Sequence, residues 1–256
     1  MRLIKKSRCA NSEDIKCLFK DGVSTLNSLK ECSVDLIVTD PPYKTTSRGN
    51  AGTSGGMMQT DICKKGQMFK HNDLVPKDYA KSMFRVLRDG SHCYVMCNHV
   101  NLQEMINSFT AVGFHFVKSL IWDKGNKIMG KFYMSQFEYI LFFRKGRGVQ
   151  INDCGTSDIL RVPNKKPKDS KGSVLHVTAK PVELMEILIR NSSKEGELIV
   201  DPFAGIFTTA IACKKLKRKF IGCEVDKQYF EIGLDLLNNK EIKDMSKYGC
   251  VQQRAD

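Results

Sequence analysis

Short apolar runs alternate with amphipathic stretches along most of this 256-residue chain. The runs at 15–20, 34–39, 92–97 and 198–200 have the length and residue types of buried strands. Helical patterns separate most of these runs, and strands separated by helices favour a sheet that is mostly parallel and covered on both faces. The sequence therefore predicts a doubly wound α/β fold.

The remaining elements follow from periodicity, N-cap residues and glycine or proline breaks. Helices are expected at 78–87, 101–112, 181–191, 208–216 and 227–237, and further strands at 114–122, 138–143 and 220–223. No convincing helix separates the strands 114–122 and 138–143. They are therefore expected to form an antiparallel hairpin at an edge of the sheet.

Two segments interrupt the alternation within what we expect to be a single domain, 1–256. The segment 45–67 is rich in Gly, Ser and Thr, and is expected to be a mobile loop over a site. The segment 146–173 contains prolines and several lysines, which suits either a linker or a target-recognition segment.

The charge of the chain points to a polyanionic partner. Lys and Arg outnumber Asp and Glu by 41 to 28, which gives a formal net charge of +13. Nucleic acid is the leading candidate, although solvated lysines that only aid solubility would account for part of the excess. Basic residues cluster at 64–65, 165–171 and 214–219.

Ten cysteines without a C-x-x-C pair or an apolar leader favour a reducing, cytoplasmic compartment. No apolar run reaches the length of about 18 residues that a membrane span needs, so no membrane association is expected. His92, Cys93, Cys97 and His99 could be read as a zinc site. Alternation along a strand favours core packing for Cys93 and Cys97 instead, so no metal is expected.

The tetrapeptide Asp40-Pro41-Pro42-Tyr43 directly follows the predicted strand 34–39. A carboxylate or a carbonyl can accept hydrogen bonds from an exocyclic amine, and a tyrosine can stack on a flat ring. This combination indicates chemistry on a nucleobase. A strand end followed by a simple Pro-Pro turn is the structural alternative.

A second turn, Asp201-Pro202-Phe203-Ala204-Gly205, follows the predicted strand 198–200 and precedes a predicted helix. Open parallel sheets bind small ligands at such strand ends. Glu224 follows the next strand, at about the spacing at which such folds place an acidic residue on ribose hydroxyls. A cofactor that carries a nucleoside fits this pattern.

Three motifs together resemble those of the S-adenosylmethionine-dependent DNA amino-methyltransferases. They are Asp40-Pro41-Pro42-Tyr43, His176-x-Thr-x-Lys180-Pro181-x-Glu183-Leu184 and Asp201-Pro202-Phe203-Ala204-Gly205-x-x-Thr208-Thr209. Their order is similar to that of the β group, and the match covers most of residues 15–237. The resemblance implies a Rossmann-like, seven-stranded sheet, S-adenosylmethionine as the cofactor and double-stranded DNA as the substrate.

The resemblance also assigns catalytic roles to Asp40, Pro41, Pro42 and Tyr43. The Asp40 carboxylate and the Pro41 carbonyl would accept hydrogen bonds from the target amine, and Tyr43 would stack on the base. Holding the amine in this way favours direct in-line attack by its nitrogen, on a base flipped out of the duplex.

Cofactor-binding roles follow in the same way. Glu224 resembles the ribose clamp, Asp21 the residue beside the adenine, and Lys180 the lysine near the cofactor carboxylate. The implied cofactor-binding set is Asp21, Asp40, Lys180, Asp201, Phe203, Ala204, Gly205, Thr208, Thr209 and Glu224. The two threonines could instead only begin a helix, and Lys180 could be an exposed lysine at the start of a helix.

The chain departs from the family pattern at Phe207, where members commonly have a second glycine. A phenylalanine there must point away from the cofactor or narrow its pocket. We expect Phe207 to pack under the following helix and cofactor binding to survive.

These observations predict a site-specific DNA methyltransferase that forms N6-methyladenine, because family members with serine in place of Asp40 more often modify cytosine N4. Cytosine-N4 methylation remains an alternative, and so does a catalytically inactive DNA-binding relative. A prokaryotic or phage origin, action on nucleoid DNA and a possible homodimer are expected from the resemblance.

Overall fold

The computed structural model describes residues 14–42, 74–128, 132–176 and 179–243. Tyr43 and the expected mobile loop at 45–67 lie outside these residues. Every helix among the described residues is too short or too polar to serve as a membrane span.

The described residues contain an eight-stranded sheet in the order β1-β8-β7-β2-β3-β5-β4-β6. The strands are β1 (Ile15–Phe19), β2 (Val34–Thr39), β3 (Leu87–Cys97), β4 (His115–Ile128), β5 (Ser135–Arg144), β6 (Ile159–Arg161), β7 (Leu198–Asp201) and β8 (Lys219–Glu224). The pairs from β1 through to β3 are parallel, and β5 runs antiparallel to both β3 and β4. The predicted α/β class and its antiparallel hairpin are therefore confirmed.

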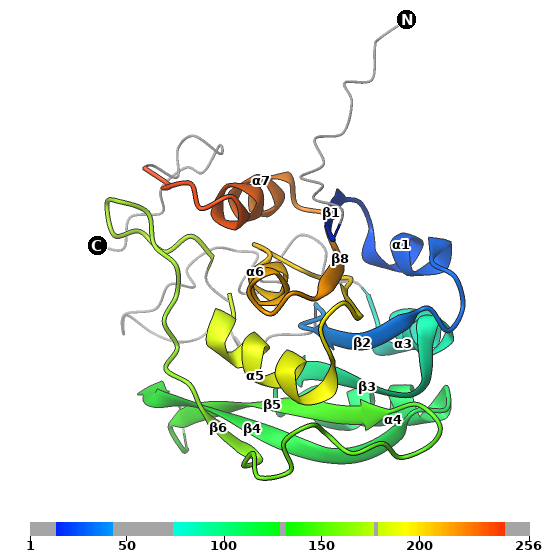
Figure 1. Ribbon diagram of the computed structural model, residues 1–256. Helices are drawn as coiled ribbons and strands as arrows, with labels where there is room; N and C mark the ends of the chain where they lie inside the picture. Colours follow the sequence, from blue (N-terminus) through cyan, green and yellow to red (C-terminus); the bar gives the residue numbers. More distant parts are fainter. Residues whose placement is uncertain (1–13, 43–73, 129–131, 177–178, 244–256) are drawn as a thin grey trace, which may run out of the picture.

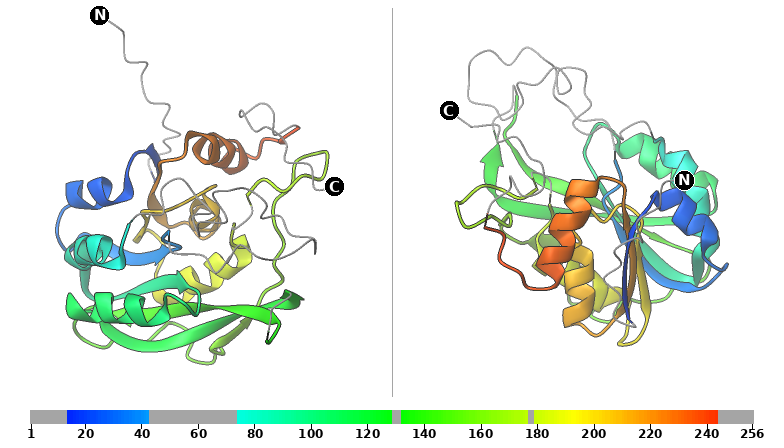
Figure 2. Two further views of the ribbon diagram at one scale, coloured as in Figure 1. Left: turned by 180° about the vertical axis from the view of Figure 1, so that it is seen from behind. Right: turned by 90° about the horizontal axis from the view of Figure 1, so that it is seen from above.

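Helices cover both faces of the sheet, as Figures 1 and 2 show. They are α1 (Gly22–Ser28), α3 (Pro76–Val86), α4 (Leu102–Ala111), α5 (Val182–Ser192), α6 (Thr208–Lys215) and α7 (Lys227–Leu237). Buried side chains of α1, α3 and α4 form one core, and those of α5, α6 and α7 contribute to the core on the opposite face. This is the doubly wound arrangement that the alternation predicts.

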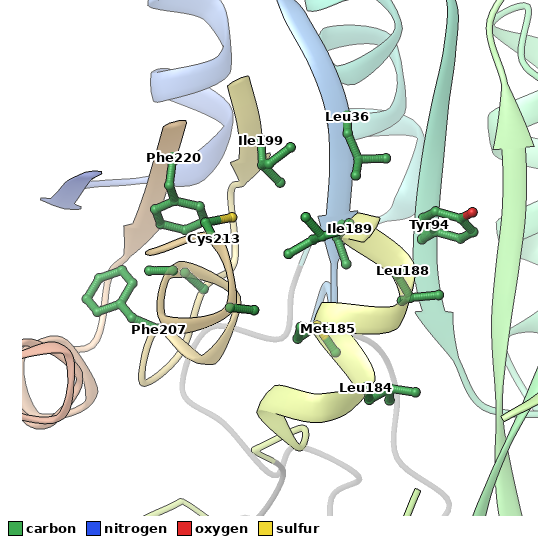
Figure 3. Close-up of a cluster of buried hydrophobic side chains, with 14 of the residues drawn as sticks. Leu36, Tyr94, Leu184, Met185, Leu188, Ile189, Ile199, Phe207, Cys213 and Phe220 are labelled. Carbon is green, nitrogen blue, oxygen red and sulfur yellow. The ribbon is translucent and has the colours of Figure 1, made fainter. Parts of the chain in front are cut away.

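Alternation along the strands decides which core each residue joins. Cys93, Val95 and Cys97 of β3 face the α3–α4 core, whereas Tyr94 and Met96 face the other. Figure 3 shows Leu188 and Ile189 of α5 in the same core as Leu36 of β2 and Tyr94. The two cysteines thus pack as small hydrophobic side chains, as the strand pattern indicates.

The strand count exceeds the expected seven by β6, which pairs in parallel with β4 at the outer edge. Its three residues are too few to produce a periodic sequence signal. β6 lies within the segment 146–173, so part of this segment is built into the sheet. Asn152 anchors it further, because its side chain donates to the carbonyls of Arg190 (2.7 Å) and Ser193 (3.0 Å) at the end of α5.

Two local features of the structure differ from the elements expected from the sequence. Helix α1 follows β1 and was not predicted, because seven residues give little periodic signal; Asp21 is its N-cap and accepts from the Ser24 amide at 2.7 Å. Helix α3 ends at Val86, and β3 begins at once. Asp89 and Gly90, which follow the predicted helix 78–87, form an irregularity within β3, where Gly90 has a φ of +76°.

Phe207 is the N-cap of α6 and has a left-handed backbone, with φ 62° and ψ 34°. Its side chain is fully buried, and its ring packs at 5.6 Å from that of Phe230 in α7. The phenylalanine therefore points into the core beside α6 (Figure 3), as expected, and not into the turn at 201–205.

Gly233 of α7 provides the space for Phe207. A Cβ atom at position 233 would lie 2.5 Å from Phe207 Cδ2 and 2.8 Å from the carbonyl carbon of Ile206. Gly233→Ala should therefore lower the free energy of unfolding by about 1–2 kcal/mol, because overpacking outweighs the gain of about 1 kcal/mol in helix propensity. Urea denaturation measures this change.

The matched control is Lys227→Ala, at an exposed position of the same helix. It should change stability by less than about 0.5 kcal/mol. A Gly233→Ala protein more stable than the wild type would show that the close contact with Phe207 is not a constraint.

Candidate active site

The predicted site residues converge because parallel strands end at one edge of the sheet. Residue pairing places Ile37 beside Val200, Asp201 beside Gly222, and Phe19 beside Glu224. The turns after β2, β7, β8 and β1 therefore lie next to one another. This is the edge at which open α/β sheets bind ligands.

The Asp201 carboxylate joins these turns. Its Oδ1 accepts from the Thr39 hydroxyl at 2.8 Å and from the Phe203 amide at 3.2 Å, and its Oδ2 accepts from the Thr209 hydroxyl at 2.7 Å. Burial raises the pKa of Asp201 to about 6, although the three hydrogen bonds act in the opposite direction and lower the pKa. Thr209 is therefore more than a helix start, because its hydroxyl links α6 to the end of β7.

Glu224 is hydrogen-bonded to the other end of the turn at 201–205. Its Oε2 accepts from the Gly205 amide at 2.9 Å, and its Oε1 accepts from the Asp226 amide at 2.7 Å. Burial raises the pKa of Glu224 to about 7. Gly205 has a φ of +54°, a conformation that glycine adopts without strain.

The other predicted turn residues take different positions. The amide of buried Ala204 donates to the Cys223 carbonyl at 2.8 Å, and Thr208 is partly exposed at the first position of α6. Phe203 is partly buried, with its ring 5.2 Å from that of Tyr79 in α3. Phe203 thus packs the turn at 201–205 against helix α3.

The His176 segment reaches the same turn. An added Cβ at Gly205 would lie 3.6 Å from His176 Nε2, and the imidazole lies 4.1 Å from the ring of Tyr229. Burial lowers the pKa of His176 to about 3, and the positive charges of Lys180 and Lys166 lower it further. His176 is therefore a neutral packing group near neutral pH.

Asp40 lies one residue beyond Thr39, and its Oδ2 is 2.5 Å from Lys180 Nζ. The same ammonium is 3.3 Å from Glu138 Oε2. Burial would lower the pKa of Lys180, but the two carboxylates raise it well above its usual value. Lys180 is thus a buried cation at the site, not an exposed lysine. Pro41 and Pro42 continue the turn, and Tyr43 lies outside the described residues.

A family model of DNA methylases, the N6/N4 group, matches residues 34–235. The chain belongs to this family. Membership confirms the resemblance that the motifs indicated, and with it S-adenosylmethionine as the cofactor.

Relatives of this DNA methylase include the type II methyltransferases M2.LlaDCHI of Lactococcus lactis subsp. cremoris and M2.DpnII of Streptococcus pneumoniae. The first is 28% identical over 85% of this chain and 87% of its own length, and the second is 26% identical over 87% and 89%.

Solved structures share the fold at lower identity. PvuII DNA methyltransferase, titled cytosine-N4-specific, has a TM-score of 0.65 at 17% identity and covers 91% of this chain and 96% of its own. The S-adenosylmethionine complex of TTHA0409 from Thermus thermophilus, a protein titled a DNA modification methylase, has a TM-score of 0.60 at 21% identity, over 89% and 99%.

Sequence reasoning missed Glu138 and Lys124 as members of the methylase site. Glu138 Oε1 is 2.5 Å from Lys124 Nζ, which connects the β4–β5 hairpin to Lys180 and Asp40. A signal was present, because Glu138 is the one acidic residue in the otherwise apolar run 137–143. Its partner could not be identified without the pairing of the strands.

The basic cluster at 214–219 is poorly placed for DNA at this edge of the methylase, because it lies where the chain returns from α6 to the amino end of β8. Several residues of this cluster also form ion pairs or hydrogen bonds within the protein. Lys215 pairs with Glu186 at 2.9 Å, and buried Arg218 donates to the Ser193 carbonyl at 2.9 Å. Within the described part of the chain, no group of three His, Cys, Asp or Glu residues could hold a metal ion.

The raised pKa of Asp201 predicts how stability depends on pH. The folded carboxyl keeps its proton up to about pH 6, whereas the unfolded one loses it near 3.8. The resulting stabilisation is complete below pH 3.8 and is lost as pH rises through about 6, which amounts to on the order of 3 kcal/mol. The unfolding free energy of the wild type, minus that of Asp201→Asn, should therefore fall between pH 4 and 7.5 in urea titrations.

Asp158→Asn provides the comparison, because Lys118 lowers the pKa of this exposed carboxyl. The same difference, taken for this variant, should not fall with rising pH. If the Asp201 difference stays flat or increases over this range, the carboxyl is not buried as described.

Proposed function

We propose that this methylase transfers a methyl group from S-adenosylmethionine to the N6 amine of adenine in double-stranded DNA. The observation that carries the proposal is the position of Asp40 beside the Asp201 turn. Thr39 donates to Asp201 at 2.8 Å, so the residue after it lies where a base-binding turn and a cofactor-binding turn meet.

The residues at this edge suit the proposed cofactor. Glu224 presents a carboxylate to ribose hydroxyls, and the turn at 201–205 with the Lys180 ammonium suits the methionine end. Asp21, exposed at the end of β1, is assigned to the adenine side. When bound, S-adenosylmethionine would supply an electrophilic methyl group on a sulfonium, with a neutral thioether as the leaving group, and the methylated amine would lose one proton.

The protein's own contribution is to hold the target amine. The Asp40 carboxylate and the Pro41 carbonyl accept its hydrogens, which orients the nitrogen lone pair and stabilises the positive charge that develops on it. Pro42 shapes the turn, and Tyr43 is assigned to stacking on the base. A duplex base reaches this turn only when it is flipped out of the stack, at a cost of a few kcal/mol.

DNA is proposed to lie across the edge formed by the site and the β4–β5 hairpin. β3 ends at Cys97, which pairs with Tyr139, so the hairpin extends beyond β3 on the site's side. Phe132 and Tyr133 at its end are 87% and 93% exposed, which is unusual for aromatic side chains and suits stacking on bases.

Lysines of the segment 146–173 suit the phosphates on this edge. Burial lowers the pKa of Lys166, and the charges of Lys124 and Lys180 lower it further; the charge of Lys166 in turn helps to lower the pKa of His176, so this part of the chain lies beside the site. Lys165, Lys168 and Lys171 are exposed around it. We therefore propose that the segment contributes to target recognition, and that likeness to type II methyltransferases extends to action at a specific sequence. A homodimer remains an expectation from the resemblance.

Cytosine N4 is the alternative target, favoured by the fold shared with PvuII methyltransferase. Aspartate at position 40 favours adenine, because the resemblance associates serine there with cytosine. An inactive DNA-binding relative is less well supported, since Phe207 points into the core and does not fill the turn.

Methylation of plasmid DNA from an unmethylated host tests the proposed activity. After incubation with S-adenosylmethionine, chromatography of the digested DNA should show N6-methyladenine, and direct reading of modified bases should locate the recognised sequence. Asp40→Asn should lower turnover at least about 1000-fold, because the amide cannot provide the same charged acceptor.

Glu195→Gln is the control, since Glu195 is 65% exposed and pairs only with Lys217 within the described structure. It should retain wild-type turnover. N4-methylcytosine as the product would replace the adenine assignment, and activity retained by Asp40→Asn would remove that residue from the mechanism.

DNA affinity measured between 50 and 200 mM salt distinguishes phosphate contacts made by lysines from stacking of aromatic side chains on bases. Lys165→Ala should reduce the slope of log affinity against log salt by about 1, as expected for one lost phosphate contact. Tyr133→Ala should weaken binding by about 1–3 kcal/mol at every salt concentration and leave the slope unchanged, as expected for lost stacking.

Lys217→Ala, at the opposite edge, should change neither quantity. An unchanged affinity for both Lys165→Ala and Tyr133→Ala would place DNA elsewhere.

A further inference from the structure

Four largely buried ionisable side chains form a continuous chain of ion pairs beside the proposed base-binding turn. Asp40 Oδ2 is 2.5 Å from Lys180 Nζ, which is 3.3 Å from Glu138 Oε2, and Glu138 Oε1 is 2.5 Å from Lys124 Nζ. None of the four side chains is more than 24% exposed. Two carboxylates and two ammoniums make the chain neutral overall.

The sole tryptophan, Trp122, fixes the two lysines. Its indole nitrogen donates to the Val162 carbonyl at 2.8 Å, and its ring is 1% exposed. Lys124 Nζ lies 5.1 Å and Lys180 Nζ lies 6.0 Å from the ring centroid. Both ammoniums are thus attracted to the same aromatic ring.

The charge states of the chain are set by these neighbours. Burial alone would raise the pKa of Glu138, but Lys180 and Lys124 hold it below its usual value. Asp40 and Glu138 raise the pKa of Lys180 in spite of burial. Glu138 is therefore an anion and Lys180 a cation at neutral pH.

This arrangement weakens Asp40 as an acceptor. The proposed function requires the Asp40 carboxylate to accept a hydrogen bond from the target amine, and the Lys180 ammonium on its Oδ2 already offsets much of the negative charge that would attract this amine. A buried ammonium that leaves its carboxylate must find another, because an unpaired buried charge is strongly unfavourable. Glu138 Oε2 is already within 3.3 Å of the same nitrogen.

We propose that Glu138 is a positioning residue that takes over Lys180 when the target amine binds, so that the negative charge of Asp40 is directed at this amine and Asp40 becomes a stronger acceptor. Lys124 holds the other oxygen of Glu138 and so fixes the direction of its carboxylate. The ammonium needs only to move between two carboxylates that it already contacts. This inference rests on the proposed methyl transfer.

Two variants test the role of Glu138 in turnover on plasmid DNA. Glu138→Gln leaves Lys180 bound to Asp40 and adds one uncompensated positive charge. Glu138→Gln combined with Lys124→Gln restores neutrality but still offers Lys180 no second carboxylate. Both should lower kcat about 100-fold, with DNA affinity within about twofold of the wild type. Recovery of kcat in the double variant would show that only charge balance matters and would overturn the proposal.

Glu195→Gln is the control, because it breaks an exposed ion pair of 3.7 Å with Lys217 at the opposite edge of the sheet. It should keep wild-type kcat. If the wild type transfers no methyl group, the proposed function itself fails. If the wild type is active and Glu138→Gln is equally active, only the role of Glu138 fails.

Trp122 fluorescence gives a second measurement, on the wild type and without methyl transfer. A duplex that contains the mapped target should change the emission in the absence of S-adenosylmethionine, because Lys180 moves relative to the indole. A duplex whose target base lacks the exocyclic amine should bind without this change. Equal responses to the two duplexes, or no response to either, would contradict the proposed movement of Lys180.

Discussion

The hydrogen bonds of the buried Asp201 carboxylate hold this molecule's site together. One side chain receives the Thr39 hydroxyl from the end of β2, the Thr209 hydroxyl from α6 and the Phe203 amide from its own turn. Because three separate elements depend on it, the distance between the base-binding turn and the cofactor-binding turn is fixed by a group that is itself nearly inaccessible. Burial makes the charge on this carboxylate costly, and the three donors offset that cost.

Much of the fold could be predicted from local patterns. The alternation of apolar runs and helices is a property of each segment, so the long elements and the parallel arrangement were recognisable. Helix α1 and strand β6 were not, because seven and three residues carry too little periodicity. The placement of Asp40, Asp201 and Glu224 at one edge followed from the rule that parallel strands end together.

The parts of the site that could not be predicted depend on contacts between distant strands. Glu138 reaches Lys180 because β5 inserts between β3 and β4, an order that no local pattern specifies. The basic residues at 214–219 illustrate the opposite case. A helix that begins at the site must end at the far edge, so their position along the chain argues against a role at the site.

Positive charge has two different uses in this protein. Lys180 and Lys124 are enclosed by carboxylates and an indole, and their charge is balanced within the fold. Lys165, Lys168 and Lys171 are exposed and contribute to the net excess of +13. Net charge alone therefore says little about which lysines are available to a polyanion.

The close packing of the Phe207 ring against Gly233 has an evolutionary consequence. A large side chain at the left-handed position before α6 is accommodated only because α7 has no side chain at the facing position. A relative with glycine at the position of Phe207 can carry a larger residue at the position of Gly233. The two positions should therefore covary. The turn at 201–205 and helix α7 should then change together in evolution, although α7 lies outside the motifs that begin at Asp40 and Asp201.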